Sequence, residues 1–222
     1  GHDINVVGTK NVIKTCDEFN VRVIFASTCC CYGNNRLKFS TEESEVWPTE
    51  PYSKSKRESE LYILDLNKER KNKIIITRLA TFYGSMYARR ALATSLFIEK
   101  IHRGETINIH GNGSQHRTYT HVYDMCSGFI TLIKNINDLP YEIYNITSTR
   151  PISVIDIVKE TSIILQKPAN LQFIEDRSSQ FNQLVIDNSR LMSLGWKPIY
   201  TWETGMTETI NSFIKNGCKW IK

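Results

Sequence analysis

A tyrosine and a lysine four residues apart could do acid–base chemistry in this sequence. Tyr52 and Lys56 stand at the start of a segment whose composition predicts a helix, and residues at this spacing share one helical face. The pKa of a phenol is about 10, but a nearby ammonium favours its phenolate form. The pair could therefore remove a proton from a substrate hydroxyl. The spacing is common, and a helix that merely contains both residues is the alternative interpretation.

A threonine could complete this pair. Thr28 follows a short apolar, β-branched run at 21–27, which predicts a buried parallel strand. In an open α/β sheet, ligands bind beyond the carboxyl ends of the strands. There the Thr28 hydroxyl could bond a substrate oxygen and exchange protons with the tyrosine. A second apolar run at 73–79 predicts another buried strand, and we expect the loop 80–84 after it to flank the same crevice.

Helices are expected to frame these strands. The sequence predicts them over 3–20, with Asp3 as a cap, over 52–71 and near 92–102. The apolar face of the first helix is expected to comprise Ile4, Val7, Val12, Ile13 and Cys16. Strands that alternate with helices predict a doubly wound, Rossmann-like α/β fold with a parallel sheet.

The pattern changes after Gly104. Short strands are expected at 106–109 and 118–122, around the glycine-rich turn 111–113. Further helices are predicted near 124–134, 153–165, 189–194 and 203–215, with short strands near Tyr144 and at 171–174. We therefore expect one domain over 1–103, which carries the catalytic helix, and a smaller mixed α/β lobe mainly over 104–222, with interleaved segments.

Composition narrows the classes of function. The chain has 222 residues, is 41% hydrophobic and has a net charge of +5, which suits a soluble domain and an anionic small molecule. The short basic cluster at 68–73 reads as a solvated helix end rather than a nucleic-acid surface. We find no signal peptide or membrane-spanning run. The six cysteines show neither a disulfide framework nor a zinc spacing, so we expect no metal and reduced thiols in a cytoplasmic protein.

Several segments together resemble one family. The runs FASTCCCYG, PYSKSK, RLATFYG and GNGSQHRTYTHVYD occur in this order from Phe25 to Asp124. With the NVVGT segment at 5–9 they resemble the NAD-dependent nucleotide-sugar epimerase/dehydratase family, of the extended short-chain dehydrogenase/reductase type. The segment 176–196 is similar to the C-terminal part of that family's 4,6-dehydratases. The resemblance covers nearly the whole chain.

The resemblance implies a mechanism and a substrate. Hydride would pass from sugar C4 to NAD while the Tyr52 phenolate accepts the hydroxyl proton. Lys56 would bind the nicotinamide ribose and lower the tyrosine pKa, and Thr28 would orient the sugar hydroxyl. The residues implied to contact the cofactor are Ala26, Ser27, Tyr52, Lys56 and Leu79. The substrate would be a nucleotide-diphosphate sugar.

The same resemblance assigns residues to the nucleotide sugar. Arg117 and Arg177 match phosphate-binding arginines, since a guanidinium can clamp a diphosphate through two hydrogen bonds, although surface arginines are the alternative. Arg90 could also reach the diphosphate or cap the next helix. Asn108 and His110 match positions that contact the base or ribose, although a solvent-exposed histidine is equally compatible. Thr81 stands where many relatives carry a substrate-binding asparagine.

The sequence also departs from the family pattern. It contains no GxxGxxG turn for the cofactor pyrophosphate and no identifiable acidic residue for the adenosine ribose. We therefore expect an N-terminally truncated chain that begins at the helix before the family's fourth strand and lacks the first strands of the sheet.

A second departure concerns the reaction. In 4,6-dehydratases the threonine is followed by an acid and a base, whereas Cys29 and Cys30 follow it here, and thiols are poor substitutes for those groups. We expect a 4-epimerase that acts through a transient 4-keto sugar. The alternatives are a nucleotide-hexose 4,6-dehydratase or related reductase, and an inactive nucleotide-sugar-binding or dimerising module. The resemblance also implies a homodimer through helices 3–20 and 52–71, with neither nucleic acid nor a membrane as partner.

Overall fold

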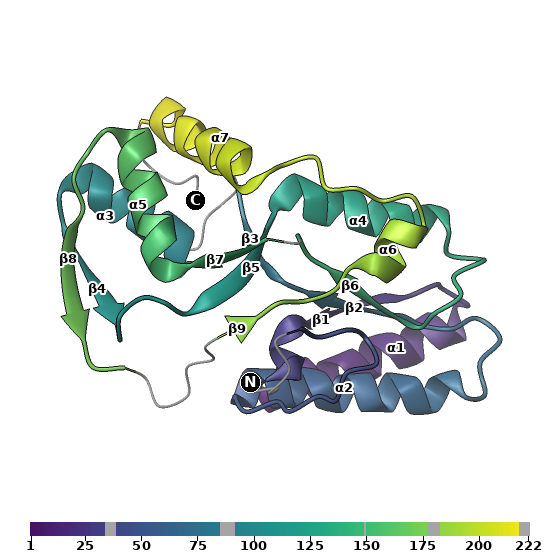
Figure 1. Cartoon of the computed structure of the whole chain (residues 1–222). Coiled ribbons are helices and arrows are strands. Elements are labelled where there is room, and N and C mark those ends of the chain that lie inside the picture. The colour runs from purple at the N-terminus through teal and green to yellow at the C-terminus, as the bar shows by residue number, and fades with distance from the viewer. Residues whose placement is uncertain (34–38, 85–91, 149, 177–182, 218–222) are drawn as a thin grey trace. The chain divides into compact units, whose positions relative to one another are not determined.

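The chain folds into two compact units whose segments alternate along the sequence (Figure 1). The computed structural model describes residues 1–33, 39–84, 92–148, 150–176 and 183–217. The first unit comprises residues 1–80, 128–147 and 186–196, and the second comprises 81–127, 148–185 and 197–222. Residues 81–103, which we expected in the first unit, belong to the second, and the units are similar in size.

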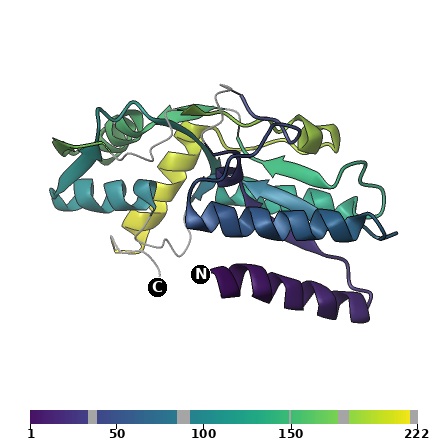
Figure 2. The ribbon, with the colours of Figure 1, turned by 90° about the horizontal axis from the view of Figure 1, so that it is seen from below.

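The first unit is built on a parallel sheet. Strands β1 (Ile24–Thr28), β2 (Ile75–Leu79) and β6 (Ile143–Ile146) lie in the order β1-β2-β6. The register places Thr28 beside Leu79 at the carboxyl ends of β1 and β2. Helices α1 (Gly8–Glu18) and α2 (Pro51–Asn67) cover one face, and α6 (Ser189–Ser193) with residues 128–134 of α4 (Val122–Lys134) covers the other (Figures 1 and 2). The expected parallel α/β fold is confirmed.

Apolar side chains from α1, α2 and β2 fill the space between helices and sheet. The buried cluster consists of Ile13, Ile63, Ile74 and Ile76. Helix α2 ends before the predicted residue 71 because the buried Asn67 side chain bonds the backbone of Ile74 in both directions, at 2.9 Å each. This amide stops the helix and starts the approach to β2.

The first helix differs from the prediction in two ways. It begins with a π-helical segment (Asp3–Val7) before α1. Its buried apolar residues are Val6 and Ile13, whereas Ile4 and Val12 are 79% and 60% exposed. Val6 and Ile13 are two turns apart, so this helix buries a narrower stripe than the sequence pattern predicted.

The second unit is mixed, as expected. Its central strand β5 (His116–His121) pairs in parallel with β3 (Thr81–Tyr83) and β9 (Gln183–Leu184), and antiparallel with β7 (Pro151–Ser153). Strands β4 (Thr106–His110) and β8 (Asn170–Ile174) form a separate parallel pair. The short strands β3, β7 and β9 were not predicted, because two or three residues are too few to show a strand period.

Three helices enclose one apolar core in the second unit. They are α3 (Ala93–Arg103), α5 (Val154–Leu165) and α7 (Trp202–Lys215), and their fully buried side chains include Ile98, Ile157, Met206, Ile210 and Phe213. Helix α7 lies very close to a tyrosine, since a Cβ at Gly205 would stand 2.2 Å from the Tyr83 hydroxyl. Glycine is therefore required at this contact.

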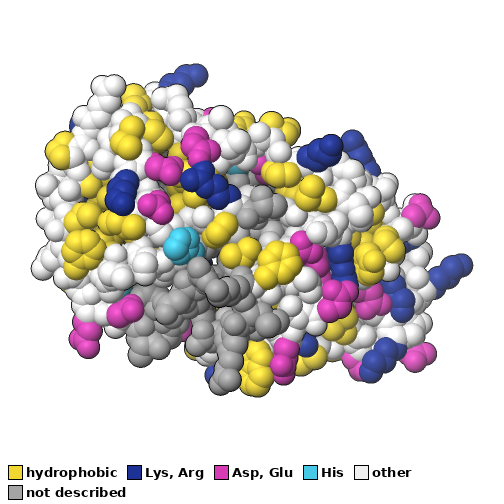
Figure 3. Space-filling view, in the orientation of Figure 1, with side chains coloured by type: hydrophobic (Ala, Val, Ile, Leu, Met, Phe, Trp, Pro, Cys, Tyr) yellow, Lys and Arg dark blue, Asp and Glu magenta, His cyan; other side chains and the backbone are white. Residues whose placement is uncertain are grey.

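The surface charges and the cysteines of the described residues can be compared with the composition. Basic and acidic side chains are interspersed on the face drawn in Figure 3. Among the described helices, none is long and apolar enough to cross a bilayer, and the described residues contain no cluster that could hold a metal ion. Five cysteines within the described ranges are free thiols: Cys16, Cys29, Cys30, Cys31 and Cys126.

Candidate active site

The threonine and the tyrosine singled out in the sequence meet in the first unit. Thr28 is the last residue of β1 and is buried, and its side chain lies close enough to the Tyr52 phenol to lower the pKa of that phenol. The Thr28 hydroxyl also accepts a hydrogen bond from the Cys30 amide at 3.2 Å. Tyr52 follows Pro51, which occupies the first position of α2, where proline costs no backbone hydrogen bond. Tyr52 as a residue is 51% exposed, so a ligand can reach it.

Lys56 lies one turn after Tyr52, but its ammonium has its own partner. The Lys56 Nζ donates to the Ala26 carbonyl at 2.9 Å and lies 4.9 Å from the centroid of the Phe25 ring. Burial lowers the pKa of Lys56. Burial also raises the pKa of Tyr52, with a smaller increase from Cys30 and Cys31, and the Thr28 hydrogen bond opposes this only in part. The structure thus gives a raised phenol pKa, not the lowered one we expected from Lys56.

The three consecutive cysteines form a short 3₁₀ helix (Cys29–Tyr32) directly after Thr28. The Cys29 thiol donates to the Arg78 carbonyl at 3.2 Å, and the Cys31 thiol donates to the Ser53 carbonyl at 3.6 Å. Burial raises the pKa of Cys29, and it raises the pKa of Cys31 to about 12. Only Cys30 of the three is exposed. The buried thiols therefore tie the turn to β2 and α2.

A buried carboxylate, which the sequence reading missed, lies behind the threonine. Glu60 is fully buried in α2 and accepts a hydrogen bond from the Ser27 hydroxyl at 2.6 Å. The Arg78 guanidinium of β2 donates to both of its oxygens, at 3.0 and 2.9 Å, and Arg57 donates at 2.9 Å. Burial alone would raise the pKa of Glu60, but Arg78, Ser27 and Arg57 lower it below its usual range. The carboxylate is thus held ionised.

The polar network continues from Arg78 across the sheet. Its guanidinium lies 4.8 Å from the centre of the Tyr32 ring, and the Tyr32 hydroxyl donates to Asn145 at 2.7 Å. The backbone N–H of Asn145 donates to the buried Glu42 carboxylate at 2.9 Å. Two signals in the sequence could have revealed the network: Arg78 interrupts an apolar strand, and Glu60 follows Lys56 by four residues.

The remaining candidates for cofactor contact lie near this pair. Ala26 is exposed and Leu79 is half-buried at the end of β2, opposite Thr28 in the register. Ser27 is buried and its hydroxyl is engaged with Glu60. A cofactor contact by Ser27 would therefore have to come from its backbone, and the expectation drawn from the resemblance stays a prediction.

The candidates for nucleotide-sugar contact belong to the second unit. Thr81 is exposed as the first residue of β3, which is a strand where we expected a loop, and Asn108 is exposed in β4. His110 ends β4, and its ring Nδ1 lies 3.0 Å from the Glu175 carbonyl. Arg117 lies in β5 and donates to the His116 carbonyl at 2.7 Å. Arg90 and Arg177 lie outside the described residues.

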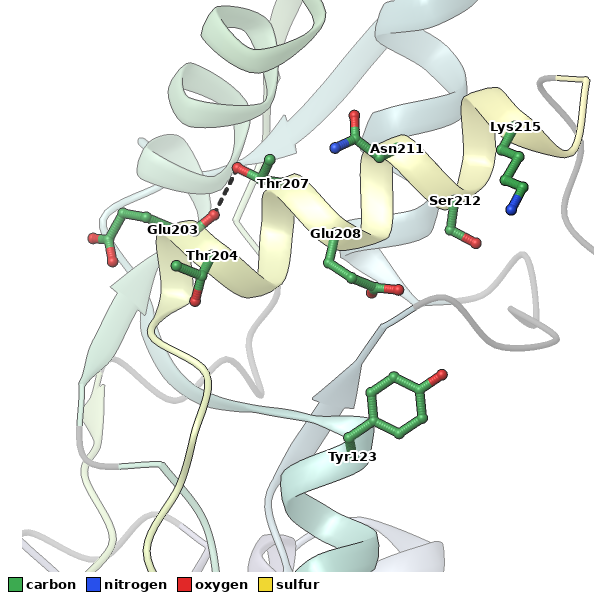
Figure 4. A pocket seen from close by; sticks show the side chains of 8 residues that line it. All are labelled: Tyr123, Glu203, Thr204, Thr207, Glu208, Asn211, Ser212 and Lys215. Carbon is green, nitrogen blue, oxygen red and sulfur yellow. Dashed lines mark hydrogen bonds between the residues drawn. The ribbon is translucent and has the colours of Figure 1, made fainter.

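The second unit also holds two hollows that no predicted site residue lines. One is a groove of about 770 Å³ along α7, where polar side chains of the helix face Tyr123 (Figure 4). The other is a cavity of about 380 Å³ with aromatic walls that include Tyr83, Tyr119 and Trp202. His121, buried beside it, stacks on Tyr200 at 3.8 Å and lies 3.2 Å from the Glu208 carboxylate.

Residues 2–147 match the model of the NAD dependent epimerase/dehydratase family. The match spans more than half of the chain, so this protein belongs to that family, as the sequence motifs indicated, and NAD is the family's cofactor. Solved structures of the family have the same fold. The UDP-glucose 4-epimerase of Thermotoga maritima, crystallised with UDP-glucose, is 25% identical with a TM-score of 0.89, covering 97% of this chain and 71% of that one.

Relatives of both reaction types are similar to this chain. The dTDP-glucose 4,6-dehydratase of Bacillus anthracis, in complex with NAD, is 25% identical with a TM-score of 0.88, over 99% of this chain and 70% of that one. The curated dTDP-D-glucose 4,6-dehydratase of Mus musculus is 29% identical over 226 residues, which cover 98% of this chain and 62% of that protein. The chain thus spans less than two thirds of that relative, and the family leaves the reaction open between epimerisation and dehydration.

Proposed function

We propose that this chain supplies the catalytic and sugar-binding residues of an NAD-dependent nucleotide-sugar 4-epimerase, which acts through a transient 4-keto sugar. The observation that carries the proposal is that Thr28, at the end of β1, acts on the half-exposed Tyr52 phenol, with Lys56 one turn away. A hydroxyl, a phenol and an amine on adjoining strand and helix ends can orient a sugar hydroxyl and remove its proton.

The residues of the first unit fit the nicotinamide end of NAD. Tyr52 is half-exposed, Lys56 is partly exposed, and the Ala26 backbone that it bonds lies at an exposed position. Ribose hydroxyls could accept hydrogen bonds from this ammonium. The sequence contains no glycine-rich turn to hold the pyrophosphate, so these residues account for one end of the cofactor only. When bound, NAD supplies the hydride acceptor and donor.

The proton is handled by the chain itself. The Tyr52 phenolate accepts the proton of the sugar hydroxyl, and a raised pKa makes it a stronger base once it is formed. Thr28 can donate its one hydroxyl proton to the phenolate while its oxygen accepts from the sugar hydroxyl, which would hold the two oxygens within proton-transfer distance. In an epimerase, the same phenol returns the proton after hydride has been delivered to the other face of the keto sugar.

The second unit is proposed to bind the nucleotide diphosphate. Arg117, Arg90 and Arg177 would bind the phosphates, because a guanidinium matches phosphate oxygens in charge and geometry. Asn108 and His110 would contact the base or the ribose, and Thr81 would bond a sugar hydroxyl. The relative crystallised with UDP-glucose and the relatives named as dTDP-glucose dehydratases support a uridine or thymidine diphosphate sugar as the substrate class.

Dehydration is the second candidate, favoured by the 4,6-dehydratases among the curated relatives. That reaction needs an acid and a base beside the threonine. Here the Cys29 thiol is buried against the Arg78 carbonyl, and burial raises its pKa. Cys29 therefore cannot serve as that acid, which supports the epimerase over the dehydratase.

Product analysis tests these alternatives. The natural protein would be incubated with NAD and either UDP-glucose or dTDP-glucose, and the products separated by chromatography and identified by proton NMR. We expect the 4-epimer, and Tyr52→Phe should lower kcat by about 100-fold or more, the usual contribution of a general base. A 4-keto-6-deoxy product would establish the dehydratase, and tight sugar-nucleotide binding without turnover would establish the inactive binding module.

We also propose a homodimer, formed through residues 3–20 and 52–71. The exposed apolar residues Ile4, Val12 and Leu61 lie on these helices and are unfavourable in water. Sedimentation of the parent chain and of Ile4→Glu/Val12→Glu tests this, with dimer expected for the first and monomer for the second. The free thiols and the family's chemistry favour a cytoplasmic location.

A further inference from the structure

Three consecutive residues of β1 each interact with one residue on a single face of α2. The Ala26 carbonyl accepts a hydrogen bond from Lys56, the Ser27 hydroxyl donates one to Glu60, and Thr28 lies close enough to Tyr52 to lower its pKa. Tyr52, Lys56 and Glu60 follow one another at four-residue spacing, which keeps them on one helical face. The contact between Thr28 and Tyr52 is thus one of three parallel bridges between the strand and the helix.

The three bridges differ in strength. Tyr52 and Lys56 are partly exposed, so water competes for their hydrogen bonds. Glu60 is 0% exposed and its oxygens are bonded to Arg78, which is 2% exposed. A two-point bond between buried ions is stiff in distance and in orientation, and neither ion can leave its partner without being buried unpaired.

The buried pair also joins the two strands that carry Thr28 and Leu79 at their carboxyl ends. Arg78 pairs with Ser27 in the register of β1 and β2, and both donate to the same Glu60 carboxylate. Its backbone carbonyl accepts the Cys29 thiol of the turn that follows Thr28. One carboxylate on α2 therefore fixes the helix against β1 and β2 at the level of the catalytic residues.

We propose that Glu60, through Arg78 and Ser27, is a positioning residue that sets the rotation and height of α2 so that the Tyr52 phenol meets Thr28. Glu60 is eight residues from Tyr52, about 12 Å along a helix, and acts through the helix rather than on a substrate. Its importance for catalysis rests on the proposed function, whereas the positioning itself can be measured without a cofactor.

The test measures how far Thr28 changes the pKa of the Tyr52 phenol. A ring-fluorinated tyrosine, which titrates at lower pH than tyrosine, is placed at position 52 of the full chain, and its pKa is followed by fluorine NMR. The Thr28 hydrogen bond lowers this pKa, so Thr28→Val should raise it, by about half a unit to one unit for an ordinary hydrogen bond.

The same Thr28→Val substitution is then made in three backgrounds. In Glu60→Gln/Arg78→Met, which removes both buried charges together, we expect the effect of Thr28→Val on the pKa to disappear. In Ser27→Ala, which keeps the ion pair but frees β1 from the carboxylate, we expect at least half of the effect to be lost. Arg57→Gln is the matched control: it removes another Glu60 bond, but one within α2, and should retain the full effect.

The outcomes separate this inference from the proposed function. A full Thr28 effect that persists in the folded Glu60→Gln/Arg78→Met chain, or in Ser27→Ala if the double variant does not fold, overturns the positioning role. No Thr28 effect in the parent chain also overturns it. If the coupling behaves as expected but the natural protein neither epimerises nor dehydrates a nucleotide sugar, the positioning stands and the proposed function falls.

Discussion

The two units bury their ionisable groups in opposite ways. In the first unit, Glu60 and Arg78 are both inaccessible and are bonded to each other and to the strand that carries Thr28. In the second, His121 is buried among aromatic rings, and its carboxylate partner Glu208 stands at the surface, in the groove of Figure 4. The buried ion pair of the first unit fixes the positions of the groups that it bonds, whereas the His121 ring of the second unit mainly contributes packing contacts.

The difference follows from what each unit must hold in place. Apolar packing tolerates small shifts, because a side chain that slides keeps most of its contacts. A charged, two-point hydrogen bond tolerates little displacement. The unit that brings Thr28 to Tyr52 relies on the second kind of contact, and the unit proposed to bind the nucleotide rests on an apolar core of Ile, Met and Phe side chains.

The largest expected effect comes from breaking the ion pair on one side. Glu60→Ala leaves Arg78 buried and unpaired, and we expect a loss of about 3–5 kcal/mol in the free energy of unfolding. Urea unfolding measures it. Glu58→Ala is the matched control on the same helix: Glu58 is exposed and pairs only with His2 and Lys10 among the described residues, so a change within about 0.5 kcal/mol is expected. Equal losses for the two variants would refute the contrast.

Truncation of a buried side chain gives the corresponding loss in the free energy of unfolding for the second unit. Ile210 is fully buried in α7, and Ile210→Ala should cost about 3 kcal/mol, within the usual range of about 2–5. Ile214, one turn further on, is 48% exposed, and Ile214→Ala should cost less than about 1 kcal/mol. The same urea titrations serve here, and a similar loss at both positions would contradict the α7 packing described above.

Acid should weaken the second unit first. Burial lowers the pKa of His121 below its ordinary value, although Glu208 and Asp124 oppose this. The unfolded chain then binds the proton more readily, so stability is complete above the unfolded pKa of about 6.5 and falls as the pH drops through it toward the folded pKa. The slope can reach about 1.4 kcal/mol per pH unit for one proton.

This loss of stability is measured by urea unfolding at about pH 7.5 and about pH 5.5, with hydrogen exchange of α7 peptides as the probe. His121→Asn should flatten the pH dependence. The Glu60 pKa is lowered, so its contribution stays complete above about 4.5 and is lost only below that value. A parent chain whose α7 peptides are equally stable at both pH values would show that His121 is not buried as neutral imidazole.

The smallest effect distinguishes the three neighbouring thiols. Alkylation by iodoacetamide at about pH 8 should label Cys30 first, because it is exposed, whereas Cys29 and Cys31 are buried with raised pKa values. Mass spectrometry of the peptide around residues 29–31 counts the labels. One fast label is expected, with no loss of fold. Rapid labelling of all three would mean that the turn after Thr28 is open.

The fold was largely predictable from the sequence, and sequence patterns also named the catalytic candidates, which remain predictions. Long apolar runs and helical periodicity marked β1, β2 and α2, and the YxxxK spacing with a threonine at a strand end marked the site. The boundary between the units was not predictable, because it depends on which core the segment 81–103 joins. The three-residue strand β3 follows β2 after a single residue, so no loop signal separates them.

The electrostatics of the site were the least predictable. The spacing of Tyr52 and Lys56 shows that they share a helical face, but not that the ammonium prefers the Ala26 carbonyl or that burial raises the phenol pKa. Nor does it show that the Ser27 hydroxyl is bonded to Glu60. Such properties depend on partners that are distant in the sequence, as Glu60 and Arg78 are.

The close approach of α7 to β3 limits which substitutions these two positions can accept. At residue 205 even one methyl group would overlap the Tyr83 hydroxyl. The size of the side chain at position 205 therefore limits the size of the side chain at position 83. A Cβ at 205 would also stand 2.9 Å from the ring Cζ of Tyr83, so homologues with alanine at 205 should carry a side chain smaller than phenylalanine at 83, and tyrosine at 83 should occur with glycine at 205. The glycine in α7 is thus explained by contact with a tyrosine more than a hundred residues earlier in the chain.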